Sequence, residues 1–123
     1  MNTQNYTQKT VEAIQNAQNI ARENDNQSLV PEHLLYSLLD QDGGLIPSLF
    51  GKMGIDCNTV LGELDSYIAT LPKVSGGEMY LSSETDRVIR TAEKTAKSMN
   101  DEYVSVEHLM IGIFTNMTPE IRK

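Results

Sequence analysis

The sequence predicts an all-α protein built from two copies of one helical unit. Three observations predict this fold: a Glu-His-Leu motif that occurs twice, apolar residues at helical spacing around both copies, and turn-forming residues between the helical segments. The motif occupies residues 32–34 and again residues 107–109, a displacement of 75 positions. A long internal period of this kind is typical of paired or stacked supersecondary units.

The same displacement relates the segments that precede the two motifs. Four further residues are identical in this register, and Thr7 faces the similar Ser82. The identical pairs are Thr10 with Thr85, Ile14 with Ile89, Ala17 with Ala92, and Ala21 with Ala96. We therefore interpret residues 7–71 as the first repeat and residues 82–123 as the second. Residues 72–81 contain proline and two glycines, which predicts a connector between the repeats.

The first half of repeat one predicts two helices. Residues 7–22 carry apolar and small side chains at helical spacing, and Thr7 is a suitable N-cap because its hydroxyl can accept a hydrogen bond from the N–H of residue 9 or 10. Pro31 suits the first turn of a helix, where its missing N–H costs nothing. The second helix is therefore expected over residues 31–40, with its four leucines in the core.

The second half of repeat one predicts a short helix and a longer one. Residues 45–52 form the short helix, and Gly54 suits the position after its end. Residues 56–71 form the longer helix, with apolar side chains recurring along one side. We thus expect a four-helix unit.

Repeat two predicts a copy of the first two helices. Ser82 matches Thr7 as a cap, although Ser83 with Asp86 offers a competing capping box, and Ser105 is expected to cap the next helix. Residues 118–121 resemble the start of another helix. Because the sequence stops at residue 123, no counterpart of the fourth helix can follow, and we expect the second repeat to be truncated.

Composition limits the range of functions. A chain of 123 residues fits a single domain, and no apolar run is long enough to span a bilayer. The first residues lack a signal-peptide pattern, so we expect a cytoplasmic protein. A net charge of −7 argues against binding to nucleic acid or to an acidic membrane surface, because both need clustered Lys and Arg. Partners should be neutral, basic or hydrophobic.

No catalytic or metal-binding pattern is present in the sequence. Cys57 is the only cysteine, and His33 and His108 each lack a second His one helical turn away, so we expect the histidines to cap or pack rather than to bind metal. The glycines at 44 and 51 before Lys52 have the wrong spacing for a phosphate-binding loop. We therefore expect a binding module without enzymatic activity and without a cofactor.

A hydroxyl cap and an acid recur together in the two repeats. Thr7 is matched with Glu32, and Ser82 with Glu107. In one interpretation each acid only stabilises the first turn of its helix, by about 0.3–1 kcal/mol. In the other, each hydroxyl and acid meet in the fold and form a polar edge that binds a peptide amide or a basic side chain.

Several segments resemble the N-terminal domain of the Clp ATPases, most closely the chaperone ClpB. They are residues 25–27, 31–34, 42–47, 71–76 and 101–109. The resemblance implies a duplicated four-helix domain that recognises unfolded or aggregated polypeptide for disaggregation. It also implies a parent protein with two ATP-driven modules, which would bind ATP and form a hexameric ring, whereas this chain alone would be monomeric.

The resemblance to ClpB assigns substrate handling to Thr7, Asp101 and Glu107. The alternative relative is ClpC, whose N-terminal domain binds adaptors and phosphorylated arginine at two sites. In that case Glu32 and Ser82 would contribute to a second polar site. The chain departs from the ClpC pattern before both Glu-His motifs, at residues 30–31 and 105–106. A free-standing structural or regulatory helical protein is a third interpretation.

Overall fold

The fold is mostly helical, with two very short strands. The computed structural model describes residues 5–41, 43–74 and 76–117. Its elements, in order, are α1 (Gln8–Glu23), β1 (Ser28–Leu29), α2 (Pro31–Leu39), α3 (Leu45–Lys52), α4 (Cys57–Ala69), β2 (Tyr80–Leu81), α5 (Ser83–Ser98) and α6 (Val106–Thr115). The helices confirm the predicted all-α class. None of the helices in the described ranges is long and apolar enough to cross a membrane.

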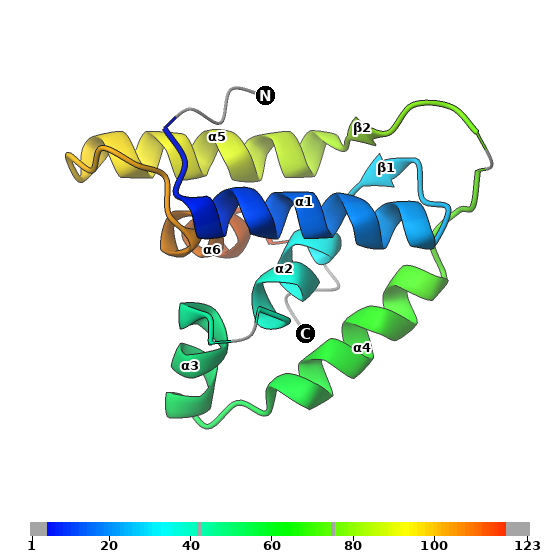
Figure 1. The fold of residues 1–123 in the computed structure, drawn as a ribbon, viewed down its shortest axis with the longest axis horizontal. Helices are drawn as coiled ribbons and strands as arrows, with labels where there is room; N and C mark the ends of the chain where they lie inside the picture. Colours follow the sequence, from blue (N-terminus) through cyan, green and yellow to red (C-terminus); the bar gives the residue numbers. More distant parts are fainter. Residues whose placement is uncertain (1–4, 42, 75, 118–123) are drawn as a thin grey trace.

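The helices form a pseudo-symmetric arrangement around α2 and α6. Figure 1 shows α1 and α5 running in opposite directions, and α2 packs on α1 as α6 packs on α5. Helices α3 and α4 flank α2 on the side away from α5. Helices α1 and α2 belong to repeat one, and α5 and α6 are their counterparts in repeat two.

Local signals explain where the two long helices begin and end. The Thr7 hydroxyl accepts a hydrogen bond from the Thr10 N–H at 3.2 Å, and the Ser82 hydroxyl accepts one from the Thr85 N–H at 3.0 Å, so Ser82 rather than Ser83 is the cap. After each helix one residue, Asp25 (φ 55°) or its counterpart Asn100 (φ 59°), adopts the left-handed conformation. Asp and Asn tolerate this conformation better than most residues, and it ends the helix.

Two short stretches of parallel pairing join each repeat to the other. In the first, β1 pairs with β2, with Leu29 opposite Leu81. In the second, Tyr6 forms an isolated parallel bridge with Val104. The repeat offset of 75 converts one pair into the other, so the leading segment of each repeat pairs with the middle of the other repeat. The sequence did not predict these strands, and β2 occupies the last two residues of the predicted connector.

The core is formed where the four central helices meet. Its fully buried large side chains include Leu29, Leu34, Leu38, Val88, Leu109 and Ile113. The four leucines of α2 are buried as predicted. On the outer side of α2, α4 contributes Leu64 and Ile68 to the buried set. Helix α2 is thereby covered on both sides, by the central helices and by α4.

The outer face of α6 is covered less than that of α2. Leu39 at the end of α2 is 3% exposed, whereas its counterpart Phe114 on α6 is 48% exposed. Within the described residues, no counterpart of α3 or α4 follows α6. The predicted helix start at residues 118–121 lies outside the described residues.

Close packing of α5 on α6 makes Gly112 a sensitive position. A Cβ atom placed on Gly112 would overlap the backbone carbonyl oxygen of Val88 in α5, so Gly112→Ala is expected to destabilise the fold by about 1–3 kcal/mol. The matched control is Gly62→Ala on the exposed side of α4, where a Cβ meets nothing within 4 Å. Alanine should stabilise that helix by about 0.5–1 kcal/mol. Urea unfolding of both variants measures the difference, and equal stabilities would contradict the described packing.

Candidate functional site

The start of α6 brings together three residues that the sequence singled out. The Thr7 N–H donates to the Val104 carbonyl oxygen at 3.0 Å, which places the start of α1 beside the segment leading into α6. Asp101 lies in the same segment, where its Oδ2 is 2.9 Å from Nε2 of His108. Glu107 is exposed in the first turn of α6. Thr7, Asp101 and Glu107 therefore gather at one end of the molecule.

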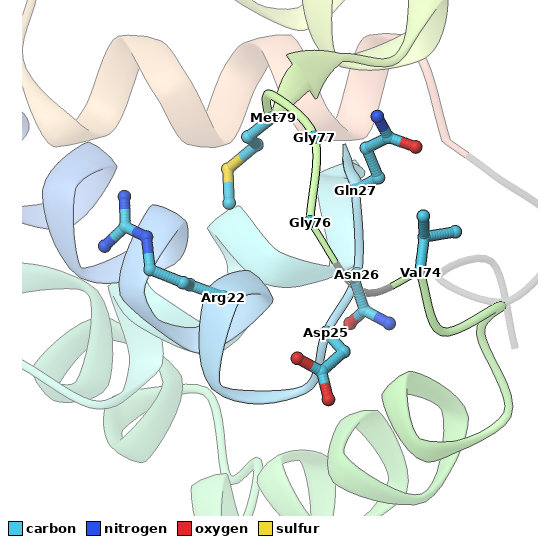
Figure 2. A pocket seen from close by; sticks show the side chains of 8 residues that line it. All are labelled: Arg22, Asp25, Asn26, Gln27, Val74, Gly76, Gly77 and Met79. Atoms are coloured by element: carbon cyan, nitrogen blue, oxygen red, sulfur yellow. The ribbon is translucent and has the colours of Figure 1, made fainter.

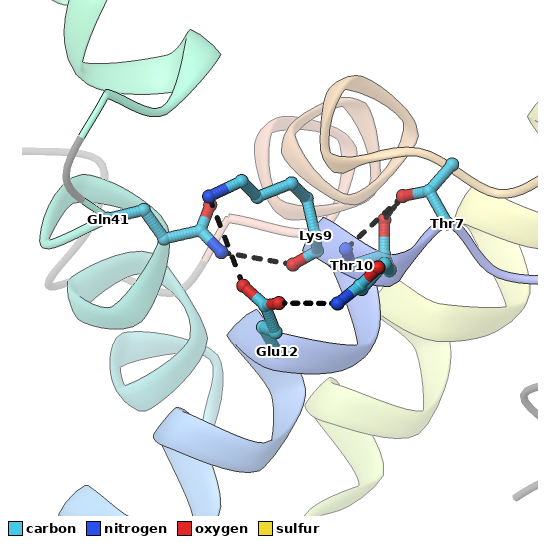
Figure 3. Close-up of polar contacts among 6 residues, drawn as sticks. Thr7, Lys9, Thr10, Glu12 and Gln41 are labelled. Atoms are coloured by element: carbon cyan, nitrogen blue, oxygen red, sulfur yellow. Dashed lines mark hydrogen bonds and ion pairs between the residues drawn. The ribbon is translucent and has the colours of Figure 1, made fainter.

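The predicted pairing of Thr7 with Glu32 is wrong, because α1 and α2 are antiparallel. Figure 3 shows the end of α2 against the start of α1, where Gln41 Nε2 donates to the Lys9 carbonyl oxygen at 3.0 Å. One turn further along α1, the Ser37 hydroxyl donates to the Ala13 carbonyl oxygen. Glu32 begins α2 and so lies beside the second half of α1, roughly 15 Å from Thr7 at 1.5 Å per residue.

The predicted pairing of Ser82 with Glu107 is wrong for the same reason. Gly112 of α6 packs against Val88 of α5, which is the counterpart of the contact between Ser37 and Ala13. Instead, the Ser82 N–H donates to the Leu29 carbonyl oxygen at 3.0 Å, which places Ser82 beside the segment that leads into α2 and Glu32. The helix cap of each repeat therefore lies beside the segment that leads into the second helix of the other repeat.

The two acids lie in different surroundings. Glu32 is 1% exposed and Ser82 is also buried, so the predicted second polar site lies beneath the surface. Glu107, at the equivalent position of repeat two, is exposed to solvent. Of these two places, the one near Glu107 offers both an exposed acid and a partly accessible cap hydroxyl, that of Thr7.

Both histidines cap the helix in which they lie, as predicted. His33 Nδ1 accepts a hydrogen bond from the Val30 N–H at 3.0 Å, and His108 Nδ1 accepts one from the Ser105 N–H at 2.9 Å. The His33 Nε2–H then donates to Oδ1 of Asn26 at 3.0 Å. Burial lowers the pKa of His33 to about 4, because the charged ring would lose its hydration.

Asn26 and Asp101 are equivalent positions with different charges. Each faces the Nε2 atom of its histidine across a single hydrogen bond, at 3.0 and 2.9 Å. The amide in repeat one is buried, whereas the Asp101 carboxylate is about half exposed. Asp101 can therefore hold His108 and still present a negative charge to a ligand.

A hollow of about 320 Å³ lies beside Asp101, and we call it the acidic hollow. It is lined by Asn5, Tyr6, Glu93, Ala96, Lys97, Asp101, Glu102 and Val104. The Tyr6 hydroxyl donates to a Glu93 carboxylate oxygen at 2.8 Å. Burial, together with the negative charge of Glu93, raises the pKa of Tyr6 far above its usual value, so this hydroxyl stays protonated. The Tyr6–Glu93 contact could not be predicted from local sequence patterns, because the two residues are 87 positions apart.

Comparison with known proteins identifies the family. The family model described as the Clp repeat (R) N-terminal domain matches residues 5–123. The chain belongs to the Clp N-terminal domain family. Among curated relatives, the chaperone ClpB of Porphyromonas gingivalis is 44% identical over 115 residues, and ClpB of Bacteroides thetaiotaomicron is 37% identical over 115 residues. These matches cover 94% of this chain but only 13% of each relative.

Solved Clp N-domains have the same fold. The Hsp104 N-terminal domain from Candida albicans superposes with a TM-score of 0.84 at 18% identity, covering 92% of this chain and 75% of that one. The ClpV1 N-terminal domain from Escherichia coli also gives a TM-score of 0.84 at 18% identity, covering 93% of this chain and 70% of that one. The helical class and the resemblance to ClpB are thereby confirmed.

No metal site is evident in the described part of this Clp N-domain. No group of three or more His, Cys, Asp or Glu side chains there could hold a metal ion. Cys57 is free and partly buried at the start of α4.

The lowered pKa of His33 predicts a loss of stability in mild acid. His33 is 0% exposed and neutral in the folded state, whereas in the unfolded chain it takes up a proton near pH 6.5. Its contribution to stability is therefore complete above about pH 6.5 and falls as the pH drops toward 4, by up to about 3 kcal/mol. Urea unfolding between pH 7 and pH 4.5 measures this loss.

The variant His33→Gln isolates this effect, because it should lose less stability than the native chain over the same pH interval. The ring-proton NMR signal of His33 gives an independent check, since the ring should remain neutral until the pH approaches 4. An ordinary titration near pH 6.5 would show that His33 is not the cause.

Proposed function

We propose that this Clp N-domain binds exposed segments of unfolded or aggregated polypeptide for a ClpB-type, ATP-dependent disaggregase. The observation that carries the proposal is the gathering of Thr7, Asp101 and Glu107 around the start of α6, beside the acidic hollow. The membership in the Clp N-domain family and the identity to ClpB relatives support it. The domain acts by recognition alone and catalyses no reaction.

The chemistry of this surface fits an unfolded chain. Carboxylates at Asp101 and Glu107 can accept hydrogen bonds from peptide N–H groups and from Lys or Arg side chains. The exposed ring of Tyr103, two residues after Asp101, adds an apolar surface. Unfolded proteins expose backbone amides and apolar side chains together, whereas native proteins bury most of both.

The remaining parts of the proposed activity belong to a longer protein. The chain spans 13% of the length of its first ClpB relatives. We assign ATP binding, hydrolysis and assembly into a hexamer to the rest of such a protein, acting in the cytoplasm. Adaptor proteins are a further class of partner for the domain.

The alternative function is a ClpC-like receptor for adaptors and phosphoarginine. The exposed Glu107 at a helix start favours it, because a carboxylate can hold a guanidinium group while free N–H groups of the helix attract phosphate. The burial of Glu32 disfavours a second site of the same kind. An arginine-phosphorylated peptide and its unphosphorylated twin separate the two functions.

Two charge-removing variants test the proposed site. Asp101→Asn keeps a hydrogen-bond acceptor for His108, as Asn26 already provides for His33, and Glu107→Gln changes an exposed side chain. Each is expected to weaken binding of a fluorescently labelled, reduced and carboxymethylated protein by about two- to fivefold, the range of an exposed charge contact. The melting temperature should change little, and Glu63→Gln on the exposed side of α4 is the matched control.

The outcomes distinguish recognition from helix capping. Weaker binding in Asp101→Asn and Glu107→Gln, with Glu63→Gln unchanged, supports the proposal. If both variants melt at lower temperature and bind as before, the acids serve only to stabilise α6. Binding that requires arginine phosphorylation and is lost in Glu107→Gln would favour the ClpC-like function.

A further inference from the structure

We infer that the fold carries a second polypeptide-binding hollow, which shares part of its lining with the acidic hollow through the internal symmetry and which binds an acidic side chain through Arg22. This inference rests on the proposed function of the acidic hollow. The second hollow has a volume of about 310 Å³, and we call it the linker hollow. It is lined by Arg22, Asp25, Asn26, Gln27, Val74, Gly76, Gly77 and Met79, and it does not include Glu32 or Ser82.

The two hollows are built on equivalent parts of the two repeats. The repeat offset of 75 converts Arg22, Asn26 and Gln27 into Lys97, Asp101 and Glu102, which line the acidic hollow. Each hollow thus lies at the end of a long helix, against the residues that follow its left-handed turn. The two volumes, about 310 and 320 Å³, are nearly equal. The internal symmetry therefore accounts for the side of each hollow at the helix end, whereas the linker residues of the second hollow have no counterpart in the lining of the acidic hollow.

Four described residues of the linker, Val74, Gly76, Gly77 and Met79, form one side of the second hollow. The Val74 N–H donates to the Asp25 carbonyl oxygen at 2.8 Å, and Gln27 Nε2 donates to the Glu78 carbonyl oxygen at 3.1 Å. These bonds hold Val74 and Glu78 against the loop between α1 and β1. Figure 2 shows the side chains of Arg22 and Met79 on one side of the Gly76–Gly77 backbone. A ligand on this side would meet a cation and a thioether together.

The side chains make the two hollows electrostatically different. The acidic hollow has carboxylates at Glu93, Asp101 and Glu102 against a single ammonium at Lys97. In the linker hollow, amides replace two of these carboxylates, and the lining carries one cation, Arg22, and one carboxylate, Asp25. Among the described residues, Arg22 donates a hydrogen bond to Asn19 but forms no ion pair. Its guanidinium group is therefore available to a carboxylate.

The occupant that fits the linker hollow is an extended segment with an acidic side chain next to apolar ones. Its carboxylate would pair with the fork of Arg22, and its apolar side chain would pack on Met79 and on the aliphatic stem of Arg22. The acidic hollow would instead take a segment with a basic side chain. One unfolded chain carries both kinds of segment, so two weak contacts could act together and raise the overall affinity.

Two short peptides and a matched pair of variants test the inference. Both peptides have a Leu-Val-Phe-Ala centre, one flanked by Asp and the other by Lys, and binding is followed by amide chemical shifts of the ¹⁵N-labelled chain. The Asp-flanked peptide should shift the amides of Gln27 and Met79. Arg22→Gln should weaken binding of the Asp-flanked peptide about two- to fivefold. The equivalent variant Lys97→Gln should leave binding of this peptide unchanged. The Lys-flanked peptide should shift Glu102 and Val104 instead.

Each outcome bears on one of the two sites. The inference fails if the Asp-flanked peptide leaves Gln27 and Met79 unshifted, or if Arg22→Gln binds it as tightly as the native chain. The proposed function stands in that case, provided the Lys-flanked peptide still binds at Glu102 and weakens in Asp101→Asn. A result in which neither peptide shifts either hollow would contradict both.

Discussion

Two backbone hydrogen bonds between the repeats determine where Thr7 lies relative to Asp101 and Glu107, and where Ser82 lies relative to Glu32. Thr7 donates its N–H to Val104, and Ser82 donates its N–H to Leu29, both at 3.0 Å. Each bond fixes the cap of a long helix beside the start of a helix in the other repeat. Because Thr7 comes from repeat one and the two acids come from repeat two, neither repeat completes the site around Glu107 alone. The surface around Thr7, Asp101 and Glu107 is a product of both halves of the chain.

The symmetry of the backbone makes the differences in side chains informative. The same hydrogen bond to a capping histidine is made by Asn26 in one repeat and by Asp101 in the other. The buried position has an uncharged amide, since an unpaired charge there would lose its hydration. The half-exposed position has a carboxylate that water still reaches. The same geometry therefore stabilises a helix in each repeat, while only repeat two presents a carboxylate to a ligand at this position.

The helices and their caps could be predicted from the sequence because their signals are local. The boundaries of α3, the cap role of Thr7 and the capping histidines all follow from spacing within a few residues. The pairing of Thr7 with Glu32 was wrong because the repeat offset says which residues are equivalent, not which are neighbours. Strands of two residues leave no period to read, so the crossed pairing could be seen only in the structure.

Native-state hydrogen exchange of the Thr7 and Ser82 amides tests the crossed pairing most directly. If these two bonds hold the repeats together, both amides should exchange only through global unfolding, with the same free energy as the core of α2. Rapid exchange of either amide, at a free energy well below that of global unfolding, would show that the segment opens by itself. The two repeats would then not be held together at that point, and the arrangement of Thr7, Asp101 and Glu107 would not be fixed.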